Sequence, residues 1–308
     1  EKDILFLLTK EDVTDLNEGH MQERPEGTAL TELQEMIGLS SVKSVIRKAI
    51  AGYKLNKLLL EKGIDRGNSS LHMVFTGNPG TAKTTVARLF AEILRDEKVL
   101  PAGTFVETGR ADLVGDHVGA TAKLVKKKFR EAQGGVLFID EAYSLCDGYK
   151  NSYGDEAINT IVQEMENHRE DVIVIFAGYS KPMEQFLERN PGMRSRIAFH
   201  IEFEDYSTEE LCSITELMLQ KNKLQIAPSA MEKLRKIYDQ ARKKSDYGNG
   251  RFVRKMLEEA QMNLAERILG LDPETLSNEA LTTIEEEDIT EPVVSSEKGE
   301  KSFGFSVA

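Results

Sequence analysis

The chain has 308 residues, enough for about two ordinary domains with sizeable cores, which excludes a disulfide-stapled miniprotein. Its 40 Lys and Arg against 52 Asp and Glu leave a net charge of −12, which disfavours a general binder of nucleic acid because such proteins are basic. The two cysteines, Cys146 and Cys212, fit a reducing compartment, so a cytoplasmic location is expected. No apolar run approaches the ~20 residues that span a bilayer, so no membrane partner is expected.

Short β-rich runs and helical patterns alternate through the first two thirds of the chain. Residues 40–61 place apolar side chains at steps of three and four, which predicts an amphipathic helix. The alternation that follows predicts a parallel sheet covered on both faces by helices, an α/β fold of three layers. The expected strands are 71–76, 105–107, 136–139, 172–177 and 199–203, and the expected helices between them are 83–97, 121–132, 155–167 and 182–189.

Beyond residue 206 the strand patterns nearly vanish. Three helical segments follow, at 208–220, 229–243 and 251–269, which predicts a second, helical domain. From Glu285 onward the composition is acidic and then rich in Ser, Glu, Lys and Gly, so we expect this tail to be mobile. The predicted organisation is a linker or remnant of a preceding segment at 1–27, an α/β domain at 28–205, a helical domain at 206–289 and a mobile tail at 290–308.

The most informative segment is the glycine-rich turn at 77–85, between a predicted strand and a predicted helix. It nearly matches the phosphate-binding P-loop, in which backbone N–H groups cradle phosphates, a lysine reaches the β and γ groups and a Ser or Thr ligates Mg²⁺. Lys83 and Thr84 fit the last two roles; the alternative is an ordinary glycine-rich turn. Ala82 replaces the motif's glycine, at a cost on the order of 1 kcal/mol if its φ is positive and almost none if φ is negative. The expected nucleotide-binding residues of this loop are Asn78, Pro79, Gly80, Thr81, Ala82, Lys83, Thr84 and Thr85.

A second motif stands 57 residues after the lysine, where the apolar run 136–139 ends in Asp140 and Glu141. In a parallel sheet this places both carboxylates at the carboxyl edge, beside the phosphate loop. We predict that Asp140, with Thr84, holds Mg²⁺ and that Glu141 polarises the attacking water. The alternative is a strand capped by solvated acids.

These two motifs, the arginines described below and the helical C-terminal domain resemble an AAA+ ATPase over residues 33–289. The segments 77–88, 138–143, 175–179 and 190–197 are more narrowly similar to the CbbX-like subfamily of red-type Rubisco activase and stage V sporulation protein K. The resemblance implies a P-loop AAA+ α/β/α sheet followed by a small helical lid. It also implies ATP or ADP and Mg²⁺ as cofactors, and a ring, expected to be hexameric, that hydrolyses ATP to remodel or partly thread a protein partner.

The resemblance implies functional arginines at two places in the chain. Arg194 and Arg196 precede the last strand, where the family carries arginine fingers that enter the neighbouring subunit's site, and the choice between them stays open. Arg251 matches the sensor 2 arginine that reports the γ-phosphate to the lid. Arg254, nearly one turn further on, is expected to be an interface or packing residue.

Three other positions are implied by the same resemblance. Tyr179 stands near sensor 1 and either presents its phenol to the lytic water or packs at the strand end. Ile37 and Gly38 match the segment that contacts adenine, although they could simply begin a helix. Leu113 and Val114 lie in the central pore loop and are expected to grip a polypeptide with exposed apolar side chains.

Two rival functions remain. An ATP-gated assembly scaffold with little hydrolysis is favoured slightly by Ala82, by Tyr179 and by the lack of an aromatic residue in the pore loop. A nucleic-acid motor is supported by the basic cluster at 126–130 alone and is opposed by the acidity of the chain.

Overall fold

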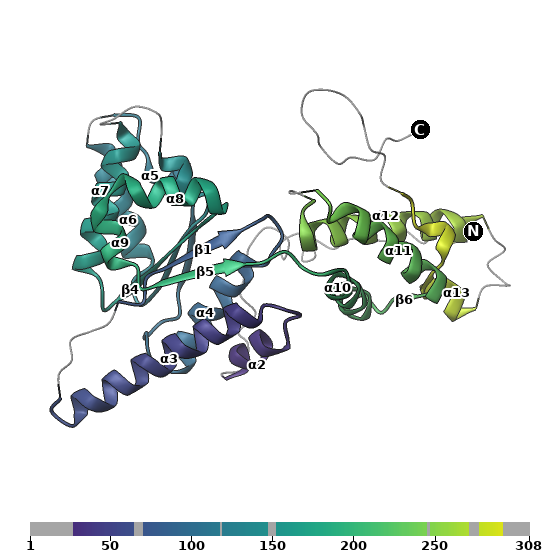
Figure 1. Ribbon diagram of the computed structural model, residues 1–308, viewed down its shortest axis with the longest axis horizontal. Coiled ribbons are helices and arrows are strands. Elements are labelled where there is room, and N and C mark those ends of the chain that lie inside the picture. Colours follow the sequence, from purple (N-terminus) through teal and green to yellow (C-terminus); the bar gives the residue numbers. More distant parts are fainter. Residues whose placement is uncertain are drawn as a thin grey trace, which may run out of the picture.

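A five-stranded parallel sheet forms the centre of the α/β part of the chain (Figure 1). The computed structural model describes residues 27–64, 70–117, 119–146, 152–244, 247–270 and 277–291. The strand order is β2-β3-β4-β1-β5, and every neighbouring pair is parallel. All five expected strands are therefore confirmed, with small differences at their ends. They are β1 (Met73–Gly77), β2 (Phe105–Thr108), β3 (Gly135–Ile139), β4 (Val172–Gly178) and β5 (Phe199–Phe203).

Helices cover both faces of this sheet. Successive side chains of a strand point to opposite sides, and because the central strands carry apolar side chains on both sides, both faces must be buried. In β1, Met73 and Phe75 belong to one buried apolar cluster, whereas Val74 belongs to a second cluster on the other face. The predicted three-layer α/β/α architecture is confirmed. The first cluster involves α2 (Thr28–Glu35), α3 (Ser40–Glu61) and α4 (Lys83–Asp96), and the second involves α6 (Ala120–Glu131), α7 (Tyr153–Asn167), α8 (Ser180–Arg189) and α9 (Pro191–Arg196).

Short helices lie where the sequence patterns predicted none. They include α2, α9 and α5 (Arg110–Leu113), each too short for an apolar repeat to be recognised. Local chemistry explains α9: Asn190 caps it by accepting a hydrogen bond from the Gly192 N–H at 2.8 Å, and Pro191 occupies its first position. In α2, Ala29 and Leu33 are buried one turn apart against α4.

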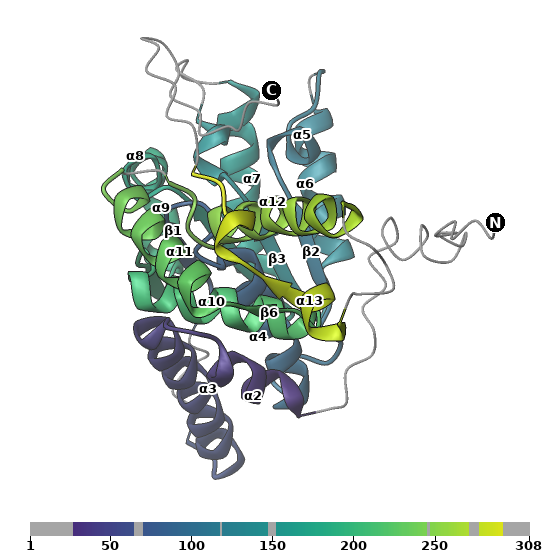
Figure 2. The same ribbon diagram turned by 90° about the vertical axis from the view of Figure 1, so that its right-hand side faces the viewer.

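The second part of the chain is a helical lid (Figure 2). Its helices are α10 (Thr208–Lys221), α11 (Pro228–Ala241), α12 (Asn249–Leu269) and α13 (Asn278–Thr282), which confirms the three predicted helices. The sequence patterns missed a two-stranded parallel sheet of β6 (Gln225–Ile226) and β7 (Thr283–Ile284), because two residues carry no periodicity.

The segment that follows β7 folds back onto α12, so the prediction of a mobile tail from Glu285 onward is wrong as far as residue 291. Asp288, in the short 3-10 helix η3 (Glu286–Asp288), is 1% exposed. It accepts hydrogen bonds from Arg267 Nε at 2.9 Å and Nη2 at 2.8 Å. Ile284 and Ile289 are buried on either side of it. Residues 292–308 of the predicted tail and residues 1–26 of the predicted linker lie outside the described residues.

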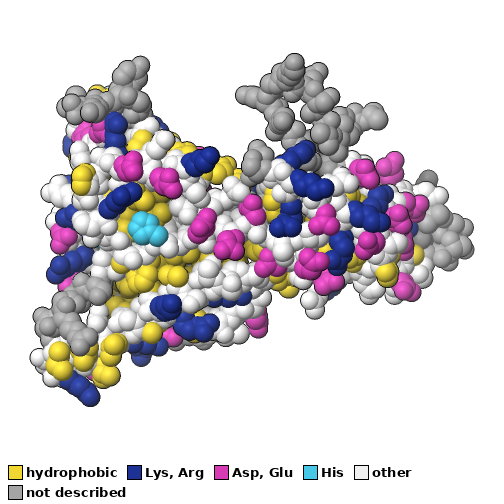
Figure 3. All heavy atoms as spheres, in the orientation of Figure 1, with side chains coloured by type: hydrophobic (Ala, Val, Ile, Leu, Met, Phe, Trp, Pro, Cys, Tyr) yellow, Lys and Arg dark blue, Asp and Glu magenta, His cyan; other side chains and the backbone are white. Residues whose placement is uncertain are grey.

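Charges of both signs are mixed on the surface. In the view of Figure 3, basic and acidic side chains are interspersed over the lid. Within the basic cluster at 126–130, Lys128 lies 3.3 Å from Glu131 and 3.8 Å from Asp112. None of the described helices combines the length and the apolar character needed to cross a membrane.

Candidate active site

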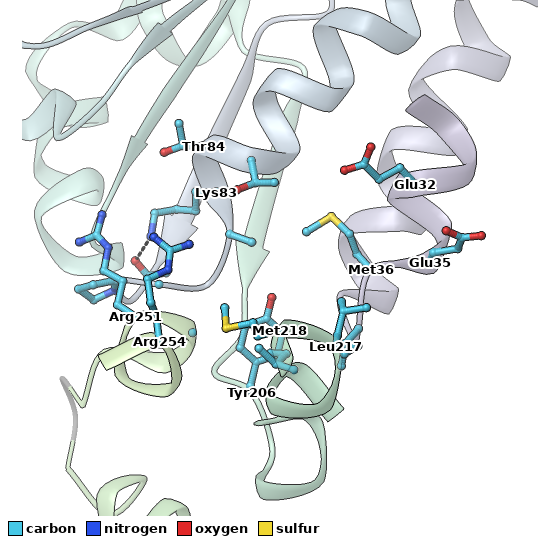
Figure 4. A pocket seen from close by; sticks show the side chains of 18 of the residues that line it. Glu32, Glu35, Met36, Lys83, Thr84, Tyr206, Leu217, Met218, Arg251 and Arg254 are labelled. Atoms are coloured by element: carbon cyan, nitrogen blue, oxygen red, sulfur yellow. Dashed lines mark hydrogen bonds between the residues drawn. The ribbon is translucent and has the colours of Figure 1, made fainter. Parts of the chain in front are cut away.

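A cavity of about 1110 Å³ lies between the carboxyl edge of the sheet and the lid (Figure 4). Its size suits a nucleotide-sized ligand. The phosphate loop, the end of β3 and the first turn of α12 line one part of it. Apolar side chains line the other part, from the residues that follow α2 (Met36 and Ile37) and from α10 (Ile214, Leu217 and Met218).

Lys83 lies at the start of α4, with its ammonium group turned onto the loop. Its Nζ donates to the Gly77 carbonyl at 2.8 Å and to the Asn78 carbonyl at 2.7 Å. Burial lowers the pKa of Lys83 to about 8, Asp140 and Asp205 oppose this shift, and Arg251 adds to it. Burial therefore disfavours the charged form of Lys83, and negatively charged phosphate groups beside the ammonium would favour that form.

The loop itself holds a left-handed residue at two positions. Gly80 has φ 73°, and Ala82, which caps α4, has φ 71° and ψ 22°. Of the two alternatives for Ala82, the positive φ is therefore the one observed. The backbone at this position favours glycine, and alanine there costs about 1 kcal/mol.

Two of the predicted loop residues use their side chains within the protein. Thr81 is fully buried, and its hydroxyl donates to the Asn78 carbonyl at 2.8 Å. The Asn78 amide donates to both carboxylate oxygens of Asp205, at 3.0 and 2.9 Å. These residues shape the loop, so any contact that they make with a phosphate comes from their backbone. Pro79, Gly80, Ala82, Lys83, Thr84 and Thr85 line the cavity directly.

The two carboxylates reach the cavity from the end of β3. Asp140 Oδ1 accepts a hydrogen bond from the Glu141 N–H at 2.9 Å. Glu141 is exposed and has φ 47°, a left-handed conformation that a residue with a side chain rarely adopts. A second hollow of about 430 Å³ adjoins both residues on the β2 side.

Oxygen atoms gather at this edge in a way that suits a hard divalent cation. Thr84 and Asp140 line the same cavity, and hydroxyl and carboxylate oxygens are ligands that Mg²⁺ prefers. The backbone carbonyl of Thr108, at the end of β2, accepts a hydrogen bond from the Asp140 N–H at 2.9 Å, while the buried Thr108 hydroxyl finds no hydrogen-bond partner among the described residues. The described residues contain no group of three or more His, Cys, Asp or Glu that could hold a metal ion.

Tyr179 lines the cavity after β4, next to a second tyrosine. Its ring centroid lies 5.9 Å from that of Tyr143, and Tyr179 is 38% exposed. Burial, with the nearby Glu141 carboxylate, raises the pKa of Tyr143 to about 12, so this phenol stays neutral. The position leaves both predicted roles of Tyr179 open.

Of the predicted adenine segment, Ile37 lines the cavity and Gly38 does not. Gly38 has φ 65° and packs against the lid, where a β-carbon would come 2.4 Å from Glu210 Oε1. The sequence did not reveal that apolar residues of α10 line this part of the site. The apolar periodicity of a helix shows which face is apolar, but it does not show whether that face packs against protein or lines a cavity.

Two arginines extend from the first turns of α12 toward Lys83 (Figure 4). Arg251 was expected there. Arg254 was expected at an interface or in packing, but it lines the cavity as well. The reason is helical geometry, since residues three apart lie on one face.

The remaining predicted residues lie outside this cavity. Arg194 and Arg196 are on α9 and line neither hollow of their own chain. Leu113 is fully buried in α5, in the cluster against which Val114 packs. The expectation that Leu113 presents an exposed apolar side chain is therefore wrong: α5 turns it into the core.

Fold and cavity together define a class, the P-loop nucleotide-binding proteins whose site is covered by a helical lid. Comparison with family models agrees. Residues 73–205 match the model of the ATPase family associated with various cellular activities (AAA), and residues 207–299 match the AAA lid domain.

Known relatives cover most of the chain. It is 42% identical over 262 residues to a protein CfxQ homolog of Trieres chinensis, covering 85% of this chain and 90% of that one. It is 41% identical to the chloroplastic ribulose bisphosphate carboxylase/oxygenase activase of Cyanidioschyzon merolae (83% and 88% covered) and 38% identical to stage V sporulation protein K of Bacillus subtilis (84% and 81%). The crystal structure of the FIGL-1 AAA domain in complex with ADP shares the fold, with a TM-score of 0.57 at 20% identity, covering 81% of this chain and 80% of that one. The chain belongs to the AAA ATPase family, in the CbbX-like group that these relatives represent.

Proposed function

We propose that this chain binds Mg·ATP and hydrolyses it in a ring, and that it uses the hydrolysis to remodel a protein partner. The observation that carries the proposal is the meeting of Lys83, Thr84, Asp140 and Glu141 at one cavity beneath Arg251 of the lid. Membership of the AAA ATPase family supports the same chemistry.

Positioning and electrostatics supply the catalysis. Lys83 and the loop amides hold the phosphates, and Thr84 and Asp140 hold Mg²⁺, which neutralises charge on the phosphate oxygens when bound. Glu141, the exposed carboxylate at the strand end, orients the attacking water and accepts its proton. Arg251 and Arg254 approach the phosphates from the lid.

A guanidinium for the transferring phosphoryl group comes from a neighbouring chain, and we assign it to Arg194. Its side chain is 59% exposed and, among the described residues, its ion pair is with Glu188 at 3.7 Å, itself 68% exposed. Arg196 is 31% exposed and lies 3.2 Å from Glu166, with a further hydrogen bond to the Gly192 carbonyl at 3.0 Å. The more exposed arginine has more freedom to enter another chain's site. A site shared in this way requires neighbouring chains, and we propose that they form a closed ring of six.

The partner is a protein. Relatives at 41% and 38% identity are named as an activase of ribulose bisphosphate carboxylase/oxygenase and as a stage V sporulation protein, so the likeness supports a protein target without choosing between these two. Leu113 is buried and cannot contact a partner at the proposed pore. The residues that would make this contact are Val114, which is partly exposed, and Asp116 and His117, which are exposed.

The test is Mg²⁺-dependent ATP hydrolysis per chain over a wide range of protein concentration. A shared site makes specific activity rise with concentration to a plateau. A flat, near-zero rate with measurable ATP binding, in the presence of candidate partners, would overturn the proposal in favour of the ATP-gated scaffold. Stimulation by DNA that weakens with salt would point to the nucleic-acid motor.

A further inference from the structure

The phosphate loop and the lid are joined by a buried polar network centred on Asn249. This residue begins α12, is fully buried and has φ 48°, a conformation that Asn tolerates better than other residues with side chains. It stands two positions before Arg251. Sequence analysis did not single it out.

The side chain of Asn249 uses its whole hydrogen-bonding capacity. Its amide nitrogen donates to Asp205 Oδ1 at 2.7 Å and to the Pro79 carbonyl at 3.3 Å. Its amide oxygen accepts from the Tyr206 N–H at 3.0 Å and from the Tyr247 hydroxyl at 2.7 Å. The carboxylate on one side and the backbone N–H on the other fix which end of the amide is which.

Asp205 extends the network to a second residue of the phosphate loop. It lies between β5 and α10, where the chain passes from the sheet to the lid. Its carboxylate accepts from Asn249 and also from the side chain of Asn78, within the loop. The loop is therefore held at Asn78 and at Pro79 by groups that belong to the connection and to the lid.

Backbone contacts also connect the phosphate loop to the start of α12. The Gly250 N–H donates to the Gly80 carbonyl at 3.0 Å. A β-carbon at Gly80 would lie 2.1 Å from the Gly248 carbonyl oxygen, so the turn of the loop rests directly on the start of α12.

We propose that Asn249 is a positioning residue: with Asp205 it ties the phosphate loop to the first turn of α12, so that the loop and Arg251 reach the nucleotide in one fixed relation. The proposal rests on the proposed nucleotide binding and hydrolysis at this cavity. The task of Asn249, whose side chain does not line the cavity, is to hold Lys83 and Arg251 in place around that cavity.

The test variant is Asn249→Asp, which keeps the shape and both acceptor interactions but loses the two donors that face Asp205 and Pro79. It also sets two carboxylates side by side. We expect the Kd for both ATP and ADP to rise by about tenfold or more, and hydrolysis per bound nucleotide to fall. In the nucleotide-free protein, the Gly250 amide should exchange hydrogen faster, a readout that does not depend on activity.

The matched control is Asn263→Ala, which removes an amide from the same helix. Asn263 donates to the Asp288 carbonyl at 2.8 Å and to Thr290 at 2.9 Å, far along α12 from the phosphate loop. This variant should lower the melting temperature and leave the Kd for nucleotide unchanged.

A rescue experiment exchanges the amide donor and the carboxylate acceptor between positions 249 and 205. The double variant Asn249→Asp with Asp205→Asn restores an amide facing a carboxylate and should recover most of the lost affinity. If Asn249→Asp lowers the melting temperature as the control does but leaves Kd within about twofold of the parent, or if the exchange recovers nothing, the positioning role is wrong. Failure of the parent chain to bind or hydrolyse ATP would instead overturn the proposed function.

Discussion

Arg196 of α9 lies 3.2 Å from the carboxylate of Glu166 on α7, so it is held within its own chain. Its backbone carbonyl also accepts a hydrogen bond from the Ser70 hydroxyl at 2.6 Å. These contacts fix α9 on the body of the domain and leave Arg194, two residues earlier, more exposed on the same short helix. The two arginines are only two residues apart in the sequence but have different surroundings.

Replacing Arg194 by Ala should lower kcat by about 10³-fold or more while ATP binding stays close to normal, because the proposed role of its guanidinium is to stabilise the transition state. Steady-state hydrolysis and binding of a fluorescent ATP analogue measure the two effects. Arg196→Ala is the matched variant and should mainly lower the melting temperature. A larger loss of kcat in Arg196→Ala than in Arg194→Ala would reverse the assignment.

Glu141→Gln should abolish turnover and keep ATP bound, since the amide cannot accept a proton from water. Undiminished hydrolysis would disprove the role of Glu141. Glu202→Gln, on the exposed side of β5, is the control and should be neutral. Mixing Glu141→Gln chains with Arg194→Ala chains should restore part of the activity, because some interfaces then join an intact Glu141 to an intact Arg194.

Ala82→Gly should raise the free energy of unfolding by up to about 1 kcal/mol, because glycine adopts φ 71° without strain. Chemical denaturation of the nucleotide-free protein measures the change. The same substitution within α4, Ala87→Gly, should lower stability by about 1 kcal/mol or more, since Ala87 is helical and fully buried. Equal losses in both variants would contradict the strain at Ala82.

The affinity for ATP should depend on pH through Lys83. Burial holds its pKa at about 8 in the nucleotide-free protein, and a bound triphosphate raises the pKa by placing negative charge beside the ammonium. Affinity is then full below pH 8 and falls as the pH rises above it, by up to about tenfold per unit, because binding must take up a proton. Titrations between pH 6.5 and about 9.5 test this slope. In Lys83→Arg the slope should disappear, since Arg stays charged throughout.

Asp288→Asn should lower the free energy of unfolding of the lid by about 2 kcal/mol, because it weakens two hydrogen bonds with Arg267 and leaves that charge partly unpaired. Hydrogen exchange over residues 283–291 should speed up. Glu287→Gln is the control: Glu287 also lies near Arg267, at 3.4 Å, but is 71% exposed and should contribute little. Comparable losses in both variants would argue against the buried pair.

Most of the α/β fold could be predicted, because its strands are continuous apolar runs and its long helices repeat their apolar residues many times. That Lys83 and Asp140 lie at the same cavity could be predicted too, since short motifs at the ends of parallel strands meet at one edge of the sheet. What failed depended on packing between distant segments. The burial of Leu113, the placement of Arg254 in the cavity and the pairing of Asp288 with Arg267 each require knowing which element lies against which.

Asn249 shows the same limit in another way. Between two glycines it has the composition of an ordinary turn, and its four hydrogen bonds go to residues from 2 to 170 positions away in the chain. Nothing in the local sequence distinguishes a solvated asparagine from one that is fully buried.

The backbone of Glu141 carries a consequence for how this protein could be stabilised. Glu141 has φ 47° and ψ 43°, a conformation that glycine adopts most easily. Glycine at this position would relieve backbone strain on the order of 1 kcal/mol. Glycine has no carboxylate to orient water. Given the proposed role of Glu141, a selection for thermal resistance alone would favour an inactive variant at this position, so stabilised variants of this chain should be screened for turnover and not by melting temperature alone.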